Sequence, residues 1–276
     1  MNRKTNSRKF QKRDRPNRTP STPRDQTPCL TPLSGLHPID AVFRYNPFVV
    51  EEFYFSQQMA AQIADAANFL RQEGKIAEQA DDKKLAQLAQ TPDHDGVVAL
   101  AKRAALKTIG PKQAAAFAKE AHPLLIVEGK ISQTEAGELI RSAVYYGIEK
   151  IFFADSNISL FNDPAAYRSA RGGLDMAELR ILNDLPAFAK QLRKSYYIIG
   201  SHYEGEDLLD YTALCPAEEL GKPLAIIIPA SDQGLAKATQ PSCHSIIAVT
   251  PSQALDRLSL ASEAALLLQK YVAEGV

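Results

Sequence analysis

The stretch that decides the fold is residues 124–147, LLIVEGKISQTEAGELIRSAVYYG. It opens with an unbroken apolar run, residues 124–127, which is typical of a strand covered on both faces in a parallel sheet. Ser132 followed by Glu135 fits a capping box, so it predicts that a helix begins there; Thr134 is an alternative cap. The stretch therefore indicates a buried strand, a polar turn and a helix.

The predicted helix is amphipathic. Apolar residues at helical spacing mark the face that should pack on the sheet, namely Ala136, Leu139, Ile140, Ala143 and Val144. Arg141 lies outside this face. One interpretation is a surface arginine that pairs with Glu138, three residues earlier. The other is a functional arginine, and the rest of the chain has to decide between them.

Composition narrows the class of protein. The chain has 276 residues, 45% of them apolar, which is enough for one large or two ordinary domains. Cys29, Cys215 and Cys243 show neither disulfide-framework nor Cys-x-x-Cys spacing, which favours a reducing compartment. The histidines have no metal-ligand spacing, and no apolar run is long enough to cross a membrane. The N-terminus also lacks the apolar core of a signal peptide. We expect a cytoplasmic protein without metal or membrane partners.

The formal net charge of zero hides an uneven distribution. Residues 1–35 carry nine Lys or Arg against two Asp, a net of +7, so the other 241 residues carry −7. Residues 1–34 are also polar and rich in proline, so they cannot bury enough apolar surface to fold, and we expect a disordered basic arm. Such an arm binds polyanions through phosphate contacts. The alternative is a solubilising tail.

Residues 35–103 indicate a small α/β unit. Helices are expected at about 39–44, from about 59 to Gly74, and at 83–89; strands are expected at 48–55, near Ile76 and at 97–100. His94 stands in a turn before the last strand, where a structural role is favoured. Residues 104–121 are rich in alanine and predict a helical linker.

Residues 122–276 alternate strands with helices, which predicts a parallel sheet with helices on both faces. Strands are expected at 124–127, 151–154, 196–199, 224–228 and 246–249, and helices at 135–146, 175–193, 206–219 and in a final segment ending near Val272. Open sheets of this kind bind ligands at the carboxyl ends of their strands. Here those ends are residues 128–134, 200–205, 229–234 and 250–258. No glycine-rich phosphate loop follows any strand.

Several motifs, in order and at the expected spacing, resemble the SpoU-type (TrmH-like) RNA ribose methyltransferases of the SPOUT superfamily. Residues 36–42 and 94–97 resemble the helix and the closing turn of that family's substrate-binding domain. Residues 135–148, which contain Arg141, resemble its first motif, and residues 168–173 resemble the segment after the next strand. Residues 224–235 resemble the second motif, and residues 249–271 the third.

The resemblance implies a small RNA-binding α/β domain followed by an α/β domain with a parallel sheet and a deep trefoil knot. It further implies a homodimer that uses S-adenosylmethionine to methylate a ribose 2′-hydroxyl of tRNA or rRNA. Arg141 matches the catalytic arginine of the first motif. Five residues match the cofactor-binding loops: Pro229, Ala230, Gly234, Thr250 and Leu260.

The motifs depart from the family pattern at several positions. Glu135 replaces an Asn, the second motif reads Pro229-Ala230-Ser231-Asp232-Gln233-Gly234-Leu235, and Ala254 replaces a loop glycine. The third-motif Ser-Leu-Asn aligns without a gap to Leu258-Ser259-Leu260, or with a shift of one residue to Ser259-Leu260-Ala261, and the Asn is missing in either alignment. These departures predict weakened or lost cofactor binding, because loop glycines permit close backbone approach and proline has no amide donor. Two alternatives to the enzyme follow: an inactive RNA-binding relative, or an assembly module.

Overall fold

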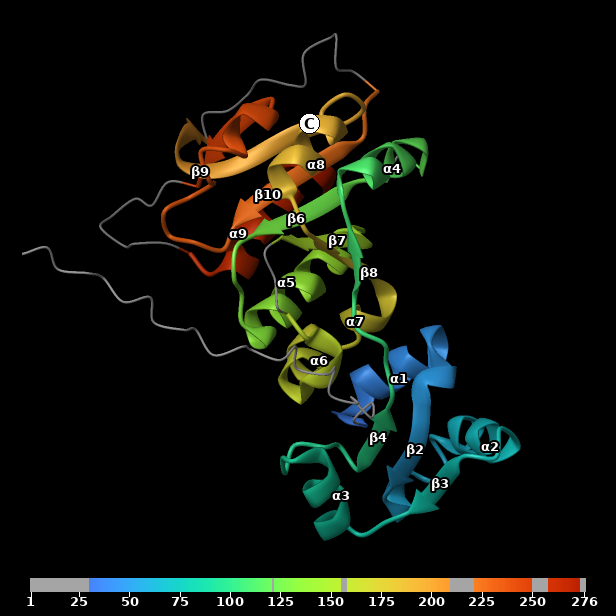
Figure 1. The fold of residues 1–276 in the computed structure, drawn as a ribbon. Helices are drawn as coiled ribbons and strands as arrows, with labels where there is room; N and C mark the ends of the chain where they lie inside the picture. Colours follow the sequence, from blue (N-terminus) through green and yellow to red (C-terminus); the bar gives the residue numbers. More distant parts are fainter. Residues whose placement is uncertain (1–29, 121, 155–157, 209–220, 250–257, 274–276) are drawn as a thin grey trace, which may run out of the picture.

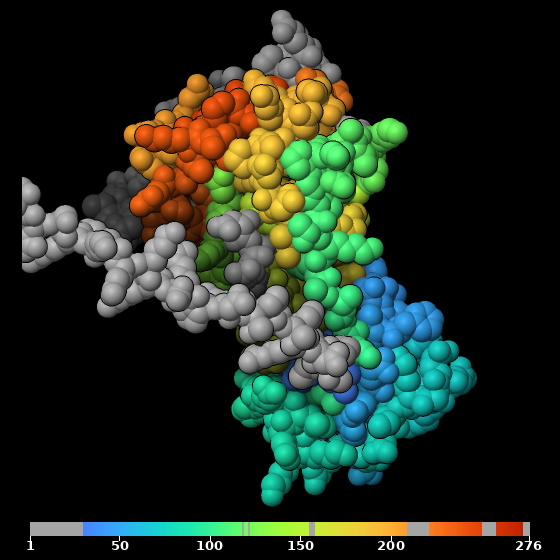
Figure 2. All heavy atoms as spheres, in the orientation of Figure 1, coloured from blue at the N-terminus to red at the C-terminus, as the bar shows by residue number. Residues whose placement is uncertain are grey.

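The computed structural model describes residues 30–120, 122–154, 158–208, 221–249 and 258–273, and they form two lobes (Figures 1 and 2). Residues 1–29 of the expected arm, the predicted helix beyond residue 208 and Thr250 lie outside the described residues. Within the described part, no helix has the length and apolar character needed to cross a membrane.

The smaller lobe, here the small domain, is built on a four-stranded sheet in the order β1-β4-β2-β3. Its strands are β1 (Thr31–Ser34), β2 (Val50–Phe55), β3 (Ile76–Gln79) and β4 (Val97–Ala101); β2 and β3 are parallel and the other pairs antiparallel. Helices α1 (Leu36–Tyr45) and α2 (Ala64–Gln72) contribute to the core on one face, while α3 (Asp82–Ala89) covers the other. The expected arm is therefore wrong for residues 31–34, because pairing with β4 gives their backbone a sheet partner.

The larger lobe, here the large domain, is built on a seven-stranded sheet in the order β11-β9-β10-β6-β7-β8-β5, and every adjacent pair is parallel. The central strand is β6 (Leu124–Glu128), which opens the stretch that the sequence singles out. The other strands are β5 (Lys107–Ile109), β7 (Lys150–Ala154), β8 (Glu178–Leu182), β9 (Tyr197–Asp207), β10 (Leu224–Pro229) and β11 (Ser245–Ala248). The predicted parallel α/β sheet is confirmed.

Helices cover both faces of this sheet. Alternate residues of β6 point to opposite sides: Leu125 and Val127 contact the core under α5 (Gln133–Tyr145) and α9 (Leu260–Leu268), which pack against each other. Leu124 and Ile126 contact the core under α4 (Ala114–Glu120) and α8 (Leu185–Leu192). A π-helical turn, Gln269–Ala273, extends α9. Figure 1 shows these layers.

Two secondary-structure predictions are wrong over most of their length, and a third, the helix at 206–219, is wrong at its start because β9 runs to Asp207. Residues 175–193 form no continuous helix: α7 (Gly173–Met176) is followed by β8, and α8 begins only after Asp184. The linker is not helical throughout, because Lys107–Ile109 form β5 on the edge of the large sheet, followed by a 3-10 turn (Pro111–Gln113) and then α4. In both cases pairing between distant segments, β8 with β7 and β5 with β8, outweighs local helix propensity.

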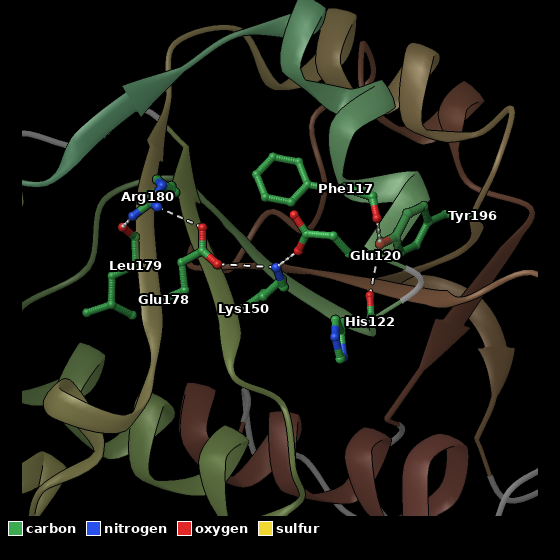
Figure 3. Close-up of polar contacts among 8 residues, drawn as sticks. All are labelled: Phe117, Glu120, His122, Lys150, Glu178, Leu179, Arg180 and Tyr196. Carbon is green, nitrogen blue, oxygen red and sulfur yellow. Dashed lines mark hydrogen bonds and ion pairs between the residues drawn. The ribbon is translucent and has the colours of Figure 1, made fainter. Parts of the chain in front are cut away.

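A polar network holds the amino ends of the central strands (Figure 3). Lys150, the first residue of β7, donates to Glu120 of α4 and, at 3.2 Å, to Glu178 of β8. Arg180 pairs with the other oxygen of Glu178 at 2.7 Å. Tyr196 places its hydroxyl within hydrogen-bond distance of the carbonyls of Phe117 and His122. The network lies at the opposite end of the strands from the carboxyl edge, so we assign it a structural role.

Candidate functional site

The carboxyl edge of the large sheet joins the ends of β6 and β10. Glu128, the last residue of β6, pairs with Pro229, the last residue of β10, and its carbonyl accepts from the amide of Ala230 at 2.8 Å. Its carboxylate accepts from the amide of Ala236 at 2.7 Å and from the hydroxyl of Thr239. Glu128 thus folds the loop after β10 back onto the strand end. Glu128 is not among the predicted site residues, although it directly follows the apolar run of β6.

Position 234 in this loop requires glycine for two reasons: the backbone conformation and the closeness of the His202 ring. Its φ of +74° lies in the left-handed region, and a Cβ added there would stand 2.6 Å from the ring of His202. That ring stacks on Tyr203, with centroids 4.3 Å apart, and its Nδ1 accepts from the amide of Glu204 at 3.1 Å. The loop after β10 therefore packs tightly on β9.

Strand β9 bulges at this edge. Its ladder with β11 jumps from Gly200 opposite Ile246 to Glu206 opposite Ile247, so residues 201–205 lie outside the regular pairing. The bulge carries Ser201, His202 and Tyr203, so the expected ligand-binding segment at 200–205 lies at an irregular point of β9 rather than beyond its end.

A buried carboxylate lies under this bulge. The hydroxyl of Ser201 donates to Glu263 of α9, and both residues are buried. Leu260, also buried, is the first residue of α9, and Ser259 caps that helix by accepting from the amide of Ser262 at 3.2 Å. Sequence reasoning missed Glu263; the available signal was a single acidic residue within the apolar run of α9.

Arg141 is held on α5, whose capping box is formed as predicted. Glu135 accepts from the amide of Ser132 at 3.1 Å, and the Ser132 hydroxyl accepts from the amide of Glu135 at 3.2 Å. Arg141 is exposed and makes no hydrogen bond or ion pair with any residue in the described ranges, so the alternative pairing with Glu138 is not formed there.

The predicted cofactor residues fall into two groups. Pro229, Ala230 and Gly234 lie together at and after the end of β10, and Leu260 begins α9. Arg141 is on a third element, α5, which packs against α9. The predicted site residues therefore lie on three elements, α5, α9 and the loop after β10, and the contact observed among these elements is that of α5 with α9.

Comparison with known proteins assigns the chain to a family. Residues 123–269 match the model of the SpoU rRNA Methylase family, and residues 32–106 match that of the RNA 2′-O ribose methyltransferase substrate-binding domain. The chain belongs to the SpoU rRNA methylase family. The resemblance of the sequence motifs to this family is therefore confirmed.

Curated relatives of this SpoU family member include two 23S rRNA (guanosine-2′-O-)-methyltransferases named RlmB. The protein from Nitrosomonas europaea is 22% identical over 246 residues, covering 86% of this chain and 88% of the relative. The one from Shewanella oneidensis is 23% identical over 234 residues, covering 83% and 91%.

Solved structures show the same fold. A structure described as an RNA 2′-O ribose methyltransferase superposes with a TM-score of 0.69 at 17% identity, covering 91% of this chain and 90% of the other. An AdoMet-bound rRNA methyltransferase from Sinorhizobium meliloti gives a TM-score of 0.67 at 16% identity, covering 92% and 90%. At these identities the likeness establishes the fold: a small N-terminal domain followed by a domain with a parallel sheet.

Proposed function

We propose that this SpoU family member is an S-adenosylmethionine-dependent RNA 2′-O-ribose methyltransferase. The observation that carries the proposal is Arg141, an exposed arginine without a partner among the described residues, on a capped helix that packs against the candidate cofactor site. The RlmB relatives, whose names specify a guanosine 2′-O-methyltransferase of 23S rRNA, support ribosomal RNA as the substrate class.

The charge of the described residues suits the proposed cofactor. S-adenosylmethionine supplies the methyl group, and its sulfonium is a cation. Gly200 of β9 pairs with Ile227 of β10, so Ser201 and the Glu263 carboxylate lie near the last residues of β10. A buried carboxylate at that point favours a bound cation. We propose that Pro229, Ala230, Gly234, Thr250 and Leu260 line the remainder of the cofactor site.

Arg141 has the chemistry that methyl transfer to a hydroxyl requires. A guanidinium stays protonated throughout the physiological pH range, so it cannot act as a base at neutral pH. It can donate hydrogen bonds to the ribose oxygen and stabilise the negative charge that develops there as the hydroxyl proton passes to solvent water. The oxygen forms its bond to the methyl carbon as the bond from that carbon to the sulfonium breaks, which leaves S-adenosylhomocysteine. We therefore assign Arg141 the role of a polarising cation.

The experiment that tests the proposal is calorimetric titration of the purified protein with S-adenosylmethionine, followed by transfer of a labelled methyl group to deproteinised 23S rRNA. We expect saturable cofactor binding and label recovered as a 2′-O-methylnucleoside. Saturable binding without label in the RNA would contradict the enzyme and leave a binding protein.

A second candidate function is RNA binding without methyl transfer. It is favoured by the closure of the loop after β10, where the Glu128 carboxylate accepts from Ala236 and Thr239 and Gly234 packs on His202. Pro229 also supplies no amide donor at this strand end. Failure of S-adenosylmethionine to bind, together with retained RNA binding, would establish this function. The third alternative is that the large domain, which the resemblance implies to be knotted, serves only in assembly. The protein would then bind neither S-adenosylmethionine nor RNA.

We further propose the organisation that the family resemblance implies. Residues 1–29 form a basic arm that contacts RNA phosphates, the small domain extends from β1 to about residue 103, a linker spans residues 104–121, and the large domain carries a trefoil knot from residue 122 onward. The proposed assembly is a homodimer, and the proposed location is the cytoplasm.

A further inference from the structure

The arginines of this protein divide into two groups. Eight lie in the described residues, and five of them have hydrogen-bond or ion-pair partners: Arg44, Arg71, Arg103, Arg180 and Arg193. The other three are Arg141, Arg168 and Arg171. Each is exposed, and none has a hydrogen-bond or ion-pair partner within the described ranges. All three lie on or directly after two adjacent helices, α5 and α6 (Pro164–Ala170).

Close packing brings these three arginines together. At Gly137 the backbones of α5 and α6 nearly touch, because an added Cβ would clash with the Ser169 hydroxyl and stand 2.6 Å from the Ala166 carbonyl. At Gly173 an added Cβ would lie 3.5 Å from the backbone nitrogen of Arg141. Arg171 is two residues from Gly173, which places its Cα within about 12 Å of Arg141, and Arg168 lies one helical turn before Arg171.

The same segment contacts the small domain. A Cβ on Gly172 would stand 2.7 Å from Ala41 of α1 and 3.3 Å from the carbonyl of His37. Figure 1 shows α6 and α7 between α5 of the large domain and α1 of the small domain. Arg168 and Arg171 therefore belong to the segment that connects the surroundings of Arg141 to the small domain.

The backbone at Arg171 supports a role for its side chain. Its φ of 46° and ψ of 44° are left-handed, a conformation that glycine adopts without strain and that commonly ends a helix. Gly172 follows with a φ of +98°. A glycine at position 171 would thus avoid the strain that this backbone conformation imposes on arginine.

We propose that Arg168 and Arg171 form a phosphate-binding surface for the RNA backbone, along which the substrate passes from the small domain to Arg141 at the site of methyl transfer. The proposal rests on the proposed RNA substrate. Guanidinium groups bind phosphate in a bidentate manner, and neither Arg168 nor Arg171 is neutralised by a described carboxylate. The neighbouring acids Asp163 and Asp175 are engaged, the first in capping α6 and the second with Arg103.

The test compares two double variants that remove equal charge. Arg168→Gln/Arg171→Gln removes the proposed contacts and leaves Arg141 intact. Lys112→Gln/Lys190→Gln removes two exposed cations from the 3-10 turn (Pro111–Gln113) and α8, on the other face of the sheet, and serves as the control. Affinity for deproteinised 23S rRNA is measured against salt concentration, with calorimetry of S-adenosylmethionine alongside.

Each phosphate contact contributes close to one unit to the slope of log affinity against log salt. We expect the arginine variant to lower the magnitude of this slope by about 1 to 2 and to weaken binding at least about tenfold at low salt, with cofactor binding unchanged. The lysine variant should match the wild type. A single variant, Arg171→Gly, fits the left-handed backbone, so it will fold and should lower the slope by about one.

The outcomes separate this inference from the proposed function. Wild-type protein that binds the RNA with a salt slope that neither arginine variant changes would overturn the surface while leaving an RNA-binding protein. Equal losses of RNA affinity in the arginine and lysine variants would also overturn the surface, since any exposed cation would then contribute equally to RNA binding. Wild-type protein that does not bind the RNA even at low salt would overturn the RNA substrate itself.

Discussion

Arg103 and Asp175 form an ion pair buried at the junction of the two domains. Only 8% of the Arg103 side chain and none of the Asp175 side chain is exposed. Asn46, at the end of α1, donates to both the carbonyl and the carboxylate of Asp175 at 3.1 Å, and the guanidinium lies 4.7 Å from the ring centroid of Phe161. Burial lowers the pKa of Arg103. The pair, together with Asn46, thus joins the end of α1 and the last residue of the small domain to α7.

Removing one partner of this pair should be costly. Asp175→Ala leaves a buried guanidinium without its counter-charge, so we expect a loss of about 3–5 kcal/mol in the free energy of unfolding. Asp40→Ala is the matched control, because it breaks an Arg–Asp pair whose side chains are 64% and 71% exposed, and should cost less than about 1 kcal/mol. Urea denaturation measures both. Similar losses in the two variants would show that the buried pair does not stabilise the junction.

The contact between α5 and α6 depends on the absence of a side chain at Gly137. Gly137→Ala forces a Cβ against Ser169 and the Ala166 carbonyl, so we expect a loss of about 1–3 kcal/mol despite the higher helix propensity of alanine. Adding Ser169→Ala removes one of the two clashing groups and should restore part of the loss. Thermal unfolding of the single and double variants checks this. A stabilised single variant would mean that the helices are farther apart than described.

The features that the sequence predicts well are those specified by neighbouring residues. The apolar run of β6, the Ser132–Glu135 capping box and the buried face of α5 are all formed as expected. A capping box needs only residues three apart, and a buried parallel strand needs only a continuous apolar run. The strand–turn–helix unit could therefore be derived without a structure.

The features that were missed depend on distant segments. Residues 178–182 lie in a stretch with leucines at helical spacing, but they form β8 because β7 and β5 are available on either side. Asp184 followed by Pro186 is the local signal for the true start of α8, with Asp184 accepting from the amide of Ala187 at 3.0 Å. Two further features have no sequence signal as strong as the one at Asp184. They are the burial of Glu263 against Ser201 and the close contacts at Gly172 and Gly173. Both depend on elements that only the folded chain brings together.

The network at Lys150 predicts a dependence of stability on pH. Burial lowers the pKa of Lys150, but hydrogen bonds to Glu120 and Glu178 raise it by more, so its pKa is raised overall. A raised pKa in the folded state stabilises the protein below the ordinary lysine pKa, and this stabilisation is lost as the pH rises through the folded value. The pKa of Glu120 is lowered by the hydrogen bond from Lys150, so its contribution is lost as the pH falls through its folded pKa.

Lys150→Met should therefore be less stable than the wild type at neutral pH, and the difference should shrink below about pH 4 and above about pH 10. Lys150→Arg, which keeps the charge, should retain more of the wild-type stability at neutral pH. Urea midpoints across this range provide the measurement. A difference between wild type and Lys150→Met that does not vary with pH would indicate that packing of the side chain, rather than its charge, is responsible.

Arg141 is expected to act on the chemical step. At saturating RNA, Arg141→Ala should lower kcat by about 100-fold or more and leave the affinity for S-adenosylmethionine within about threefold. Arg141→Lys keeps the charge but loses the planar pair of donors, so its rate should lie between those of the wild type and Arg141→Ala. Single-turnover methyl transfer separates the chemical step from RNA binding. Unchanged single-turnover rates in Arg141→Ala would remove Arg141 from the catalytic machinery.

The last prediction concerns assembly, for which α9 provides the evidence. Leu267 and Leu268 are buried within the chain, but Leu266 of the same helix remains 44% exposed, and Tyr145 at the end of the adjacent α5 is 82% exposed. A second copy that covered these side chains would remove apolar surface from water, which is the main driving force of association. We therefore expect a dimer by sedimentation equilibrium at micromolar concentration. Leu266→Glu should shift it to monomer, because a buried unpaired carboxylate is costly. Ile76→Glu, at a position 41% exposed on β3 of the small domain, should leave the dimer intact. A wild-type monomer would contradict the homodimer, and a dimer that survives Leu266→Glu would place the interface elsewhere.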